Sequence, residues 1–113
     1  MKPITIIAPK LLKVMSIVID IAAITLWPFI ISREEMSEDV LRHETIHLAQ
    51  QKELLVIFFY LLYGWDYLRG LIKYKDKEQA YFRIRFEQEA YEKMFDKEYL
   101  NQRVKYNWLK YKV

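Results

Sequence analysis

The chain of 113 residues contains no cysteine, only two histidines, two glycines and three prolines. Without cysteine it can form no disulfide and offers no thiolate ligand, so any metal site must use histidine, carboxylate, carbonyl or water. The sequence also shows no internal repeat, no low-complexity tract and no long linker. These absences, together with the length, predict a single domain over residues 1–113.

A strong excess of one charge is also missing, since the formal net charge is +3. A dedicated nucleic-acid-binding domain is usually more basic. The tail from Arg103 to Val113 combines basic and aromatic residues that could stack on a nucleic-acid strand, but such a pattern more often covers a core with its aromatic rings. We therefore expect no nucleic-acid partner.

The apolar run from Val14 to Ile31 superficially resembles a secretory leader or a membrane span. Asp20 and Pro28 interrupt it, and no small-residue cleavage site follows. The run is better divided into two short strands rich in β-branched residues, Ser16–Ile19 and Ile24–Ile31. Pro28 indicates that the second is an edge strand, because proline cannot donate to a central ladder.

Helical patterns follow. Ser37 is a candidate N-cap for a helix from Glu38 to about Lys52. The next ten residues, Leu54–Tyr63, are all apolar, and the helix could stop at Gly64 or continue to Tyr74. Ten apolar residues fall short of the ~20 that a membrane span needs. A core helix is therefore the preferred interpretation, with contact between a membrane surface and this segment as the alternative.

Residues 73–77 form a charged connector, after which Glu78–Asp96 and then Glu98–Trp108 are expected to be helices. The predicted fold class is α+β and predominantly α, with a small antiparallel hairpin or sheet packed on three or four helices. The cytoplasm is the expected compartment, with membrane association left open.

The stretch His43-Glu44-Thr-Ile-His47 lies within the first predicted helix. At 3.6 residues per turn the two histidines are about 40° apart on one face, so both imidazoles can bind one ion. Glu44 is near enough to activate a water without being a ligand. Because zinc lowers the pKa of water and a carboxylate can accept the proton, the pattern predicts hydrolysis with Glu44 as general base and acid. It is also a short pattern that occurs by chance on surface helices.

A catalytic zinc site normally has three protein ligands, and the chain has no third histidine. On a helical wheel Glu87 falls in the middle of the apolar face of its predicted helix, where a carboxylate needs a partner or a metal. Glu89 falls on the opposite face, which we expect to be solvated. Glu87 is therefore the predicted third ligand. An ordinary buried salt bridge from Glu87 to an arginine is the alternative, with candidates Arg42, Arg69 and Arg83.

Tyr91 follows Glu87 by one turn on the same face. Its hydroxyl could steady the Glu87 carboxylate or donate to the oxyanion of a hydrolytic reaction. A core tyrosine that only packs is the alternative.

The HExxH stretch followed by Glu87-x-x-Ala90 resembles the gluzincin type of zincin-like metallopeptidase, in which a second helix supplies a ligand Glu in an E-x-x-A-D/N pattern. The wider string H-E-x-I-H-x-x-Q-Q-x-E-L-L with a later F-E-x-E-A-Y is similar to small bacterial proteins predicted to be such peptidases. The resemblance spans Ser37 to Tyr91, and Tyr91 stands where an acidic or amide residue is usual. It implies a zincin-like minimal core, one zinc per chain, a peptide or protein substrate, and a strand around Ile24–Ile31 that aligns the substrate backbone.

Two rival interpretations remain. In the first, the metal only stabilises an interaction module, which could lie on a membrane through Leu54–Trp65. In the second, the domain is helical and metal-free, and both histidines are ordinary surface residues. The chain is short for a deep cleft, so the cleft would be shallow, formed in a homo-oligomer, or completed by another protein. Two imidazoles and a carboxylate also suit Mn, Fe or Co.

Overall fold

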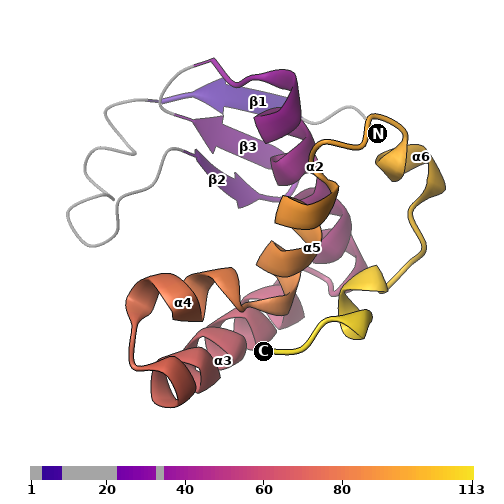
Figure 1. Cartoon of the computed structure of the whole chain (residues 1–113). Coiled ribbons are helices and arrows are strands. Elements are labelled where there is room, and N and C mark those ends of the chain that lie inside the picture. Colours follow the sequence, from indigo (N-terminus) through magenta and orange to yellow (C-terminus); the bar gives the residue numbers. More distant parts are fainter. Residues whose placement is uncertain (1–3, 9–22, 33–34) are drawn as a thin grey trace.

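A small sheet is followed by a series of helices in a computed structural model that describes residues 4–8, 23–32 and 35–113 (Figure 1). The strands are β1 (Ile4–Ile7), β2 (Ala23–Leu26) and β3 (Phe29–Ser32). The helices are α2 (Glu38–Glu53), α3 (Ile57–Tyr74), α4 (Lys77–Phe82), α5 (Arg85–Lys93), α6 (Tyr99–Gln102) and the 3-10 helix η1 (Asn107–Lys110). The predicted α+β class with a predominance of helix is confirmed.

The sheet has the strand order β1-β3-β2. Strand β3 pairs with β2 in antiparallel and with β1 in parallel, and Ile30 is aligned with Thr25 on one side and Thr5 on the other. The sheet as a whole is mixed rather than antiparallel as expected, because β1 lies beside β3 in the same direction, and only β2 and β3 form an antiparallel pair. The predicted strand Ser16–Ile19 lies outside the described residues.

The segment predicted as one edge strand, Ile24–Ile31, is in fact two strands joined by a turn at Trp27 and Pro28. Proline has a fixed φ and no N–H, properties that suit a turn as well as an edge strand. Strand β3, which follows Pro28, occupies the centre of the sheet. The edge assignment therefore holds only for β2.

Helix α2 begins and ends close to the predicted residues. The Ser37 hydroxyl accepts a hydrogen bond from the Val40 N–H at 3.2 Å, which confirms the predicted N-cap. Glu38 and Asp39 lie in the first turn, at the positive end of the helix dipole. Helix α2 contacts both β2 and α5, so it occupies the middle of the fold (Figure 1).

A sharp corner separates α2 from α3. Leu55 and Val56 both have positive φ, 55° and 63°, and the Ile57 N–H donates to the Leu55 carbonyl at 2.6 Å. This is a tight γ-turn centred on a β-branched residue, which is a strained backbone. The two helix axes differ in direction by 113°. The predicted helix thus continues to Tyr74, but only after this break.

Among the described residues, no single helix combines the length and apolar character needed to cross a bilayer, and only α2 and α3 taken together as a bent pair meet that test.

One side of α3 forms part of the core. Its Phe59 packs in a cluster of buried side chains with Ile84, Phe86 and Trp108. Trp108 comes from η1, so the aromatic tail does cover the core, as one interpretation of its sequence predicted. The preferred interpretation of Leu54–Tyr63 as a core helix is only half right, because several apolar side chains of α3 face outward.

The predicted continuous helix Glu78–Asp96 is broken between α4 and α5. Ile84 is extended (φ −58°, ψ 127°), and the Arg85 N–H donates to the buried Asp66 carboxylate of α3 at 3.2 Å. Asp66 thus replaces the helical partner that a continuous helix would supply. Helix α4 lies so close to α3 that a Cβ on Gly70 would come within 2.8 Å of the Ala80 Cα. The break allows α4 to pack on α3 and α5 to cross α2.

The predicted helix Glu98–Trp108 is likewise wrong as a single element, since α6 and η1 are separated by the extended Arg103 and by Tyr106 at φ 60°. The cause is a long-range contact. Arg103 donates to the carboxylates of Glu53 and Glu89, and the Tyr106 N–H donates to Glu53. These bonds hold the backbone out of a helix.

Candidate metal centre

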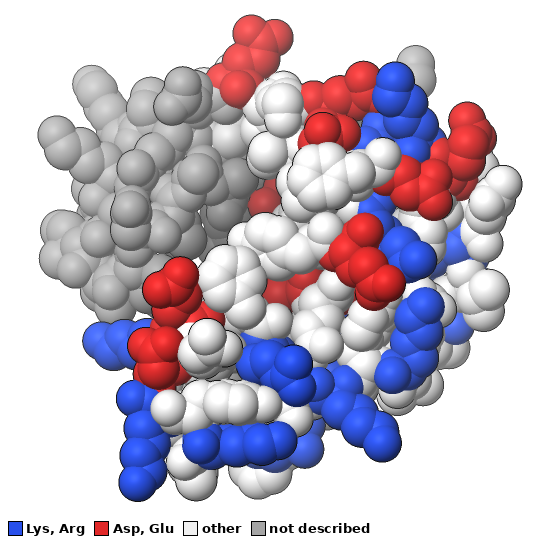
Figure 2. Space-filling view, viewed as in Figure 1, with Lys and Arg blue, Asp and Glu red and all other residues white. Residues whose placement is uncertain are grey.

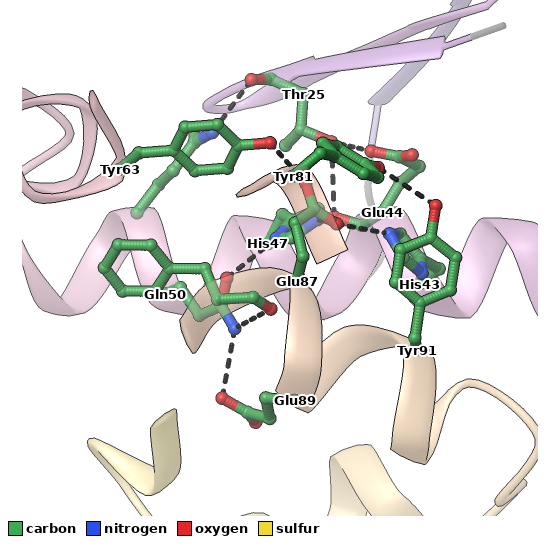
Figure 3. A network of polar contacts seen from close by, with 12 residues as sticks. Thr25, His43, Glu44, His47, Gln50, Tyr63, Tyr81, Glu87, Glu89 and Tyr91 are labelled. Atoms are coloured by element: carbon green, nitrogen blue, oxygen red, sulfur yellow. Dashed lines mark hydrogen bonds and ion pairs between the residues drawn. The ribbon is translucent and has the colours of Figure 1, made fainter. Parts of the chain in front are cut away.

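Three buried side chains from α2 and α5 meet at one point (Figure 3). The Glu87 Oε1 lies 3.1 Å from His43 Nε2 and 3.0 Å from His47 Nε2. The three ligand atoms lie within 4.8 Å of one another, and the residues are only 4–5% exposed. The convergence predicted from sequence is confirmed, and this group could hold a metal ion.

Glu87 bonds to the two imidazoles rather than to an arginine. Of the arginines considered as partners, Arg42 bonds to Glu38, Asp39 and the Met94 carbonyl, and Arg69 bonds to Asp66. The alternative of an ordinary salt bridge is therefore not what the structure shows.

Glu87 is held in place because α5 is anchored at both ends. At its start, the Asp66 carboxylate bonds to the backbone and the guanidinium of Arg85, two residues before Glu87. At its end, the Arg42 guanidinium donates to the Met94 carbonyl at 2.5 Å. The first contact joins the start of α5 to α3 and the second joins its end to α2, and together they fix where the Glu87 carboxylate lies.

Gln50 determines which nitrogen of His47 carries the proton. Its Nε2 donates to the Phe86 carbonyl and to the Glu89 carboxylate, at 3.1 and 3.0 Å, so its oxygen is the atom that faces His47 Nδ1 at 2.7 Å. Nδ1 must then be the donor, and the lone pair of the neutral ring lies on Nε2. Such a second partner is typical of metal-binding histidines.

The expectation that Glu89 lies on a solvated face is wrong, because Glu89 is 0% exposed. Its carboxylate accepts from Gln50, from the Tyr99 hydroxyl at 2.6 Å and from the Arg103 Nε at 2.6 Å. Burial acts against the ionised form, but Arg103 and the other donors outweigh it and lower the pKa of Glu89. The chain after α5 therefore supports His47 through Glu89 and Gln50.

The hydroxyl that steadies Glu87 belongs to Tyr63 of α3, which donates to Oε2 at 2.5 Å and leaves Oε1 for the imidazoles (Figure 3). Burial, with the Glu87 charge beside it, holds the pKa of Tyr63 well above its usual value, so Tyr63 remains a donor. Nothing in the local sequence marked this tyrosine, because it lies in a continuous apolar run 24 residues before Glu87.

Tyr91, the tyrosine singled out from sequence, packs against His43 with ring centroids 4.3 Å apart, and its hydroxyl lies 3.0 Å from that of Tyr81. Burial raises the pKa of both phenols, and the nearby Glu87 charge acts in the same direction. Tyr81 and Tyr91 thus form a pair of protonated hydroxyls beside the His43 side of the group.

Glu44 lies on the strand side of the group, where its Oε2 accepts a hydrogen bond from the Thr25 hydroxyl of β2 (Figure 3). It is not one of the three converging ligands. The arrangement agrees with the helical geometry expected for a carboxylate one residue after a ligand. Glu44 thus lies near the ligands and is held by a residue of the sheet. Among the described residues, no hydrogen bond joins Glu44 to Glu87.

Gln51 occupies backbone groups on the outer edge of β2. Its Nε2 donates to the Thr25 carbonyl at 2.8 Å, and its Oε1 accepts from the Trp27 N–H at 2.6 Å. The Tyr60 hydroxyl also donates to that carbonyl, at 2.5 Å. An extended peptide could pair with these two groups only after the Gln51 side chain moved away.

The electrostatics of the group favour an ion pair in the metal-free chain. Burial disfavours a charged imidazole, but the Glu87 carboxylate outweighs burial and raises the pKa of His47 to about 9. Burial also acts against a charged Glu87, but His47 and His43 hold the pKa of Glu87 well below its usual range. A proton on His47 therefore balances the negative charge of the buried Glu87, as a bound metal cation would do.

This ion pair predicts opposite pH dependences for the two forms. Because the pKa of His47 is about 9 in the folded chain and 6.5 in the unfolded chain, the ion pair stabilises fully below pH 6.5 and is lost as the pH rises through 9. Chelator-treated protein should lose about 1–3 kcal/mol of unfolding free energy over this interval. Metal needs the neutral imidazole, so the metal-induced rise in Tm should grow over the same interval.

Urea unfolding with chelator at pH 6, 7.5 and 9 measures the first effect, and thermal melts with added zinc measure the second. The matched control is His47→Gln, which keeps an amide in place of the imidazole but cannot titrate. Equal losses of stability in the parent and this variant would contradict the ion pair.

Two imidazole nitrogens and a carboxylate oxygen are the donors that zinc and related divalent ions prefer, and three protein ligands leave a fourth position for water or substrate. Gln50 fixes the tautomer of His47, whereas His43 Nδ1 has no hydrogen-bond partner in the part of the chain that the structure describes. The residues present thus fit a divalent ion. No family model, no curated protein and no solved structure matches this chain.

Proposed function

We propose that this chain is a zinc-dependent peptidase with the zinc held by His43, His47 and Glu87. The observation that carries the proposal is that these three donors converge while a further carboxylate, Glu44, stands beside them and is held by Thr25. A buried carboxylate that bonds to two imidazoles would be enough for a structural metal. The additional, separately held carboxylate is what hydrolysis needs. The resemblance of the HExxH and Glu-x-x-Ala segments to gluzincins supports the same reaction.

Bound zinc would supply a Lewis acid that polarises the substrate carbonyl and makes water a better nucleophile. Glu44 accepts the proton of the attacking water and later gives it to the leaving amine. Thr25 holds the Glu44 carboxylate by one oxygen, which leaves the other oxygen for this exchange. His47 is kept in the required tautomer by Gln50, and Tyr63 keeps the Glu87 carboxylate turned toward the imidazoles.

Tyr81 and Tyr91 are the donors for the carbonyl oxygen of the substrate. Their hydroxyls lie together on the His43 side of the group, and their raised pKa values keep them protonated. A hydrogen bond to the developing oxyanion is typically worth a factor of about 10²–10³ in rate. Of the roles that the sequence left open for Tyr91, the proposal thus adopts donation to the oxyanion, because Tyr63 is the residue that bonds to Glu87.

The decisive experiment combines a metal count with a cleavage assay. Protein purified without an affinity tag should contain one zinc per chain by elemental analysis, and His47→Ala should contain none. Loaded protein should cleave members of a mixed peptide library, detected by mass spectrometry, and a chelator should stop cleavage until zinc is restored. A parent chain that lacks bound metal after growth in zinc-supplemented medium would remove the proposal.

A second candidate is a zinc-stabilised interaction module without catalysis. The observation in its favour is the burial of the ligands, since His43, His47 and Glu87 are only 4–5% exposed. It shares the predicted metal count but not the cleavage. One zinc per chain, a Tm that collapses with chelator and no cleavage of the library would establish this candidate instead.

A further inference from the structure

The outward side of α3 is a continuous apolar surface. Its side chains are 48–70% exposed and comprise Ile57, Phe58, Leu61, Trp65, Leu68 and Ile72. At 100° per residue they occupy an arc of only about 100°, and no charged residue of α3 falls within it. The core side of the same helix lies opposite, with Phe59, Tyr63 and Asp66. We call the six exposed side chains the outer face of α3.

The corner before α3 exposes a further large apolar side chain, that of Leu55. Leu55 is 73% exposed although its φ is 55°, a conformation in which glycine or asparagine is usual. An exposed leucine at such a position stabilises neither the backbone nor the core. Val56, at φ 63°, adds a strained β-branched residue to the same corner. The corner thus exposes a further apolar side chain two residues before the outer face begins, which also favours an apolar environment there.

The exposed charged residues of α3 that border the outer face are positive. Arg69 and Lys73 lie at its margin on the helical wheel, and Lys75 follows the last turn. The one acidic residue of α3, Asp66, is buried and lies between two arginines, Arg69 and Arg85, so the three side chains together remain positive. The Lys73 Nζ donates to the main-chain oxygen of Val113 at 3.3 Å, so the segment that carries Lys110 and Lys112 lies beside this margin. Figure 2 shows Lys and Arg gathered over the lower part of the molecule, where α3 and the C-terminus lie in Figure 1.

We propose that the outer face of α3 lies on an anionic membrane surface, with the helix parallel to the bilayer plane. Its 18 residues span about 27 Å, and they combine a wide apolar arc that contains tryptophan with a basic margin. These are the features of helices that bind at the lipid interface. The positive margin matches anionic headgroups, each lysine or arginine adding roughly a fivefold increase in affinity. A second copy of this chain would bring the same positive margin against itself.

The test is co-sedimentation of the full chain with vesicles. Vesicles of phosphatidylcholine and phosphatidylglycerol in a 3:1 ratio should pellet the protein at low salt, and pure phosphatidylcholine vesicles should pellet much less. Leu61→Gln together with Trp65→Gln should lower the partition coefficient at least tenfold, and Lys73→Gln about fivefold. The matched controls are Phe95→Gln, at a side chain 68% exposed away from α3, and Lys97→Gln, which should bind like the parent.

Circular dichroism is to be used to check that each variant folds. No step requires hydrolysis, so the outcome is independent of the peptidase proposal. The parent failing to pellet with anionic vesicles at low salt would overturn the membrane proposal. So would equal losses in the controls and in the α3 variants. Sedimentation velocity without lipid provides the remaining arm: a dimer in the parent that Leu61→Gln dissociates would identify a second copy as the occupant of the outer face instead.

Discussion

Replacement of Glu44 by glutamine should leave the zinc content unchanged and lower kcat for peptide cleavage by about 10²–10⁴-fold. Glutamine has nearly the same shape and can still accept a hydrogen bond from Thr25, but it cannot take a proton from water. Because Glu44 is not one of the three converging ligands, metal affinity should not depend on its charge to first order. Elemental analysis and initial rates on the best peptide from the library measure the two effects.

The control for this prediction is Thr25→Val, which keeps the base but removes the hydroxyl that holds it. Loss of one hydrogen bond of this kind should reduce kcat only about tenfold. A Glu44→Gln variant that cleaves peptides at the parental rate would show that the assigned base is wrong. Loss of zinc in that variant would show that Glu44 belongs to the ligand set.

Replacement of Arg103 by methionine should lower the free energy of unfolding by about 3–5 kcal/mol, the usual result of removing one partner from a buried ion pair. The Arg103 side chain is 6% exposed and bonds to Glu89, which is 0% exposed, and to Glu53, which is 8% exposed. The variant leaves two carboxylates without their cation. Without Arg103 the Glu89 carboxylate would no longer be held in place, and Gln50, which bonds to it, would orient His47 less well. Zinc affinity should therefore fall by about 10–100-fold.

Urea unfolding and zinc titration in the cold, where the variant is folded, measure both effects. Arg69→Met is the matched control: its side chain is 43% exposed, and Asp66 keeps Arg85, so the loss should be below about 1 kcal/mol. Adding Glu89→Gln to Arg103→Met should recover part of the stability, because a neutral amide replaces the unpaired charge. Equal losses for Arg103→Met and Arg69→Met would contradict a buried network.

The ligands of the candidate site could be predicted because they depend on local geometry. His43 and His47 share a face of any helix that contains them, and the position of Glu87 on the apolar face of a second helix requires a buried partner. Both arguments survive errors in where the helices end. The helix of Glu87 is shorter than predicted, beginning at Arg85, yet Glu87 still faces the histidines.

The supporting residues could not be predicted, because their roles come from contacts between distant segments. Glu89 looked solvated on a helical wheel, and it is buried only because the tail folds back to supply Arg103 and Tyr99. In the sequence Tyr63 is one of ten consecutive apolar residues. It reaches Glu87 only because the corner at Leu55 and Val56 directs α3 toward α5. No periodic pattern in the sequence predicts which distant segments will come into contact.

The fold shows the same division. The cap and the start of α2 follow from Ser37 and the acidic first turn, which are local signals. The break before α5 depends on Asp66, 19 residues away, which accepts the Arg85 N–H. The parallel pairing of β1 with β3 joins segments whose register, Thr5 with Ile30, no nearby turn defines. Local chemistry could therefore be read from the sequence, and long-range partners could not.

The corner between α2 and α3 also determines how far the metal ligands would lie from a membrane on which α3 rests. With α3 flat on lipid, Tyr63 projects from the side of the helix away from the bilayer and touches Glu87, so the metal ligands would stand about one helix diameter, roughly 10 Å, above the headgroups. The scissile bond would then belong to a stretch of protein that emerges from the bilayer within a few residues of its surface.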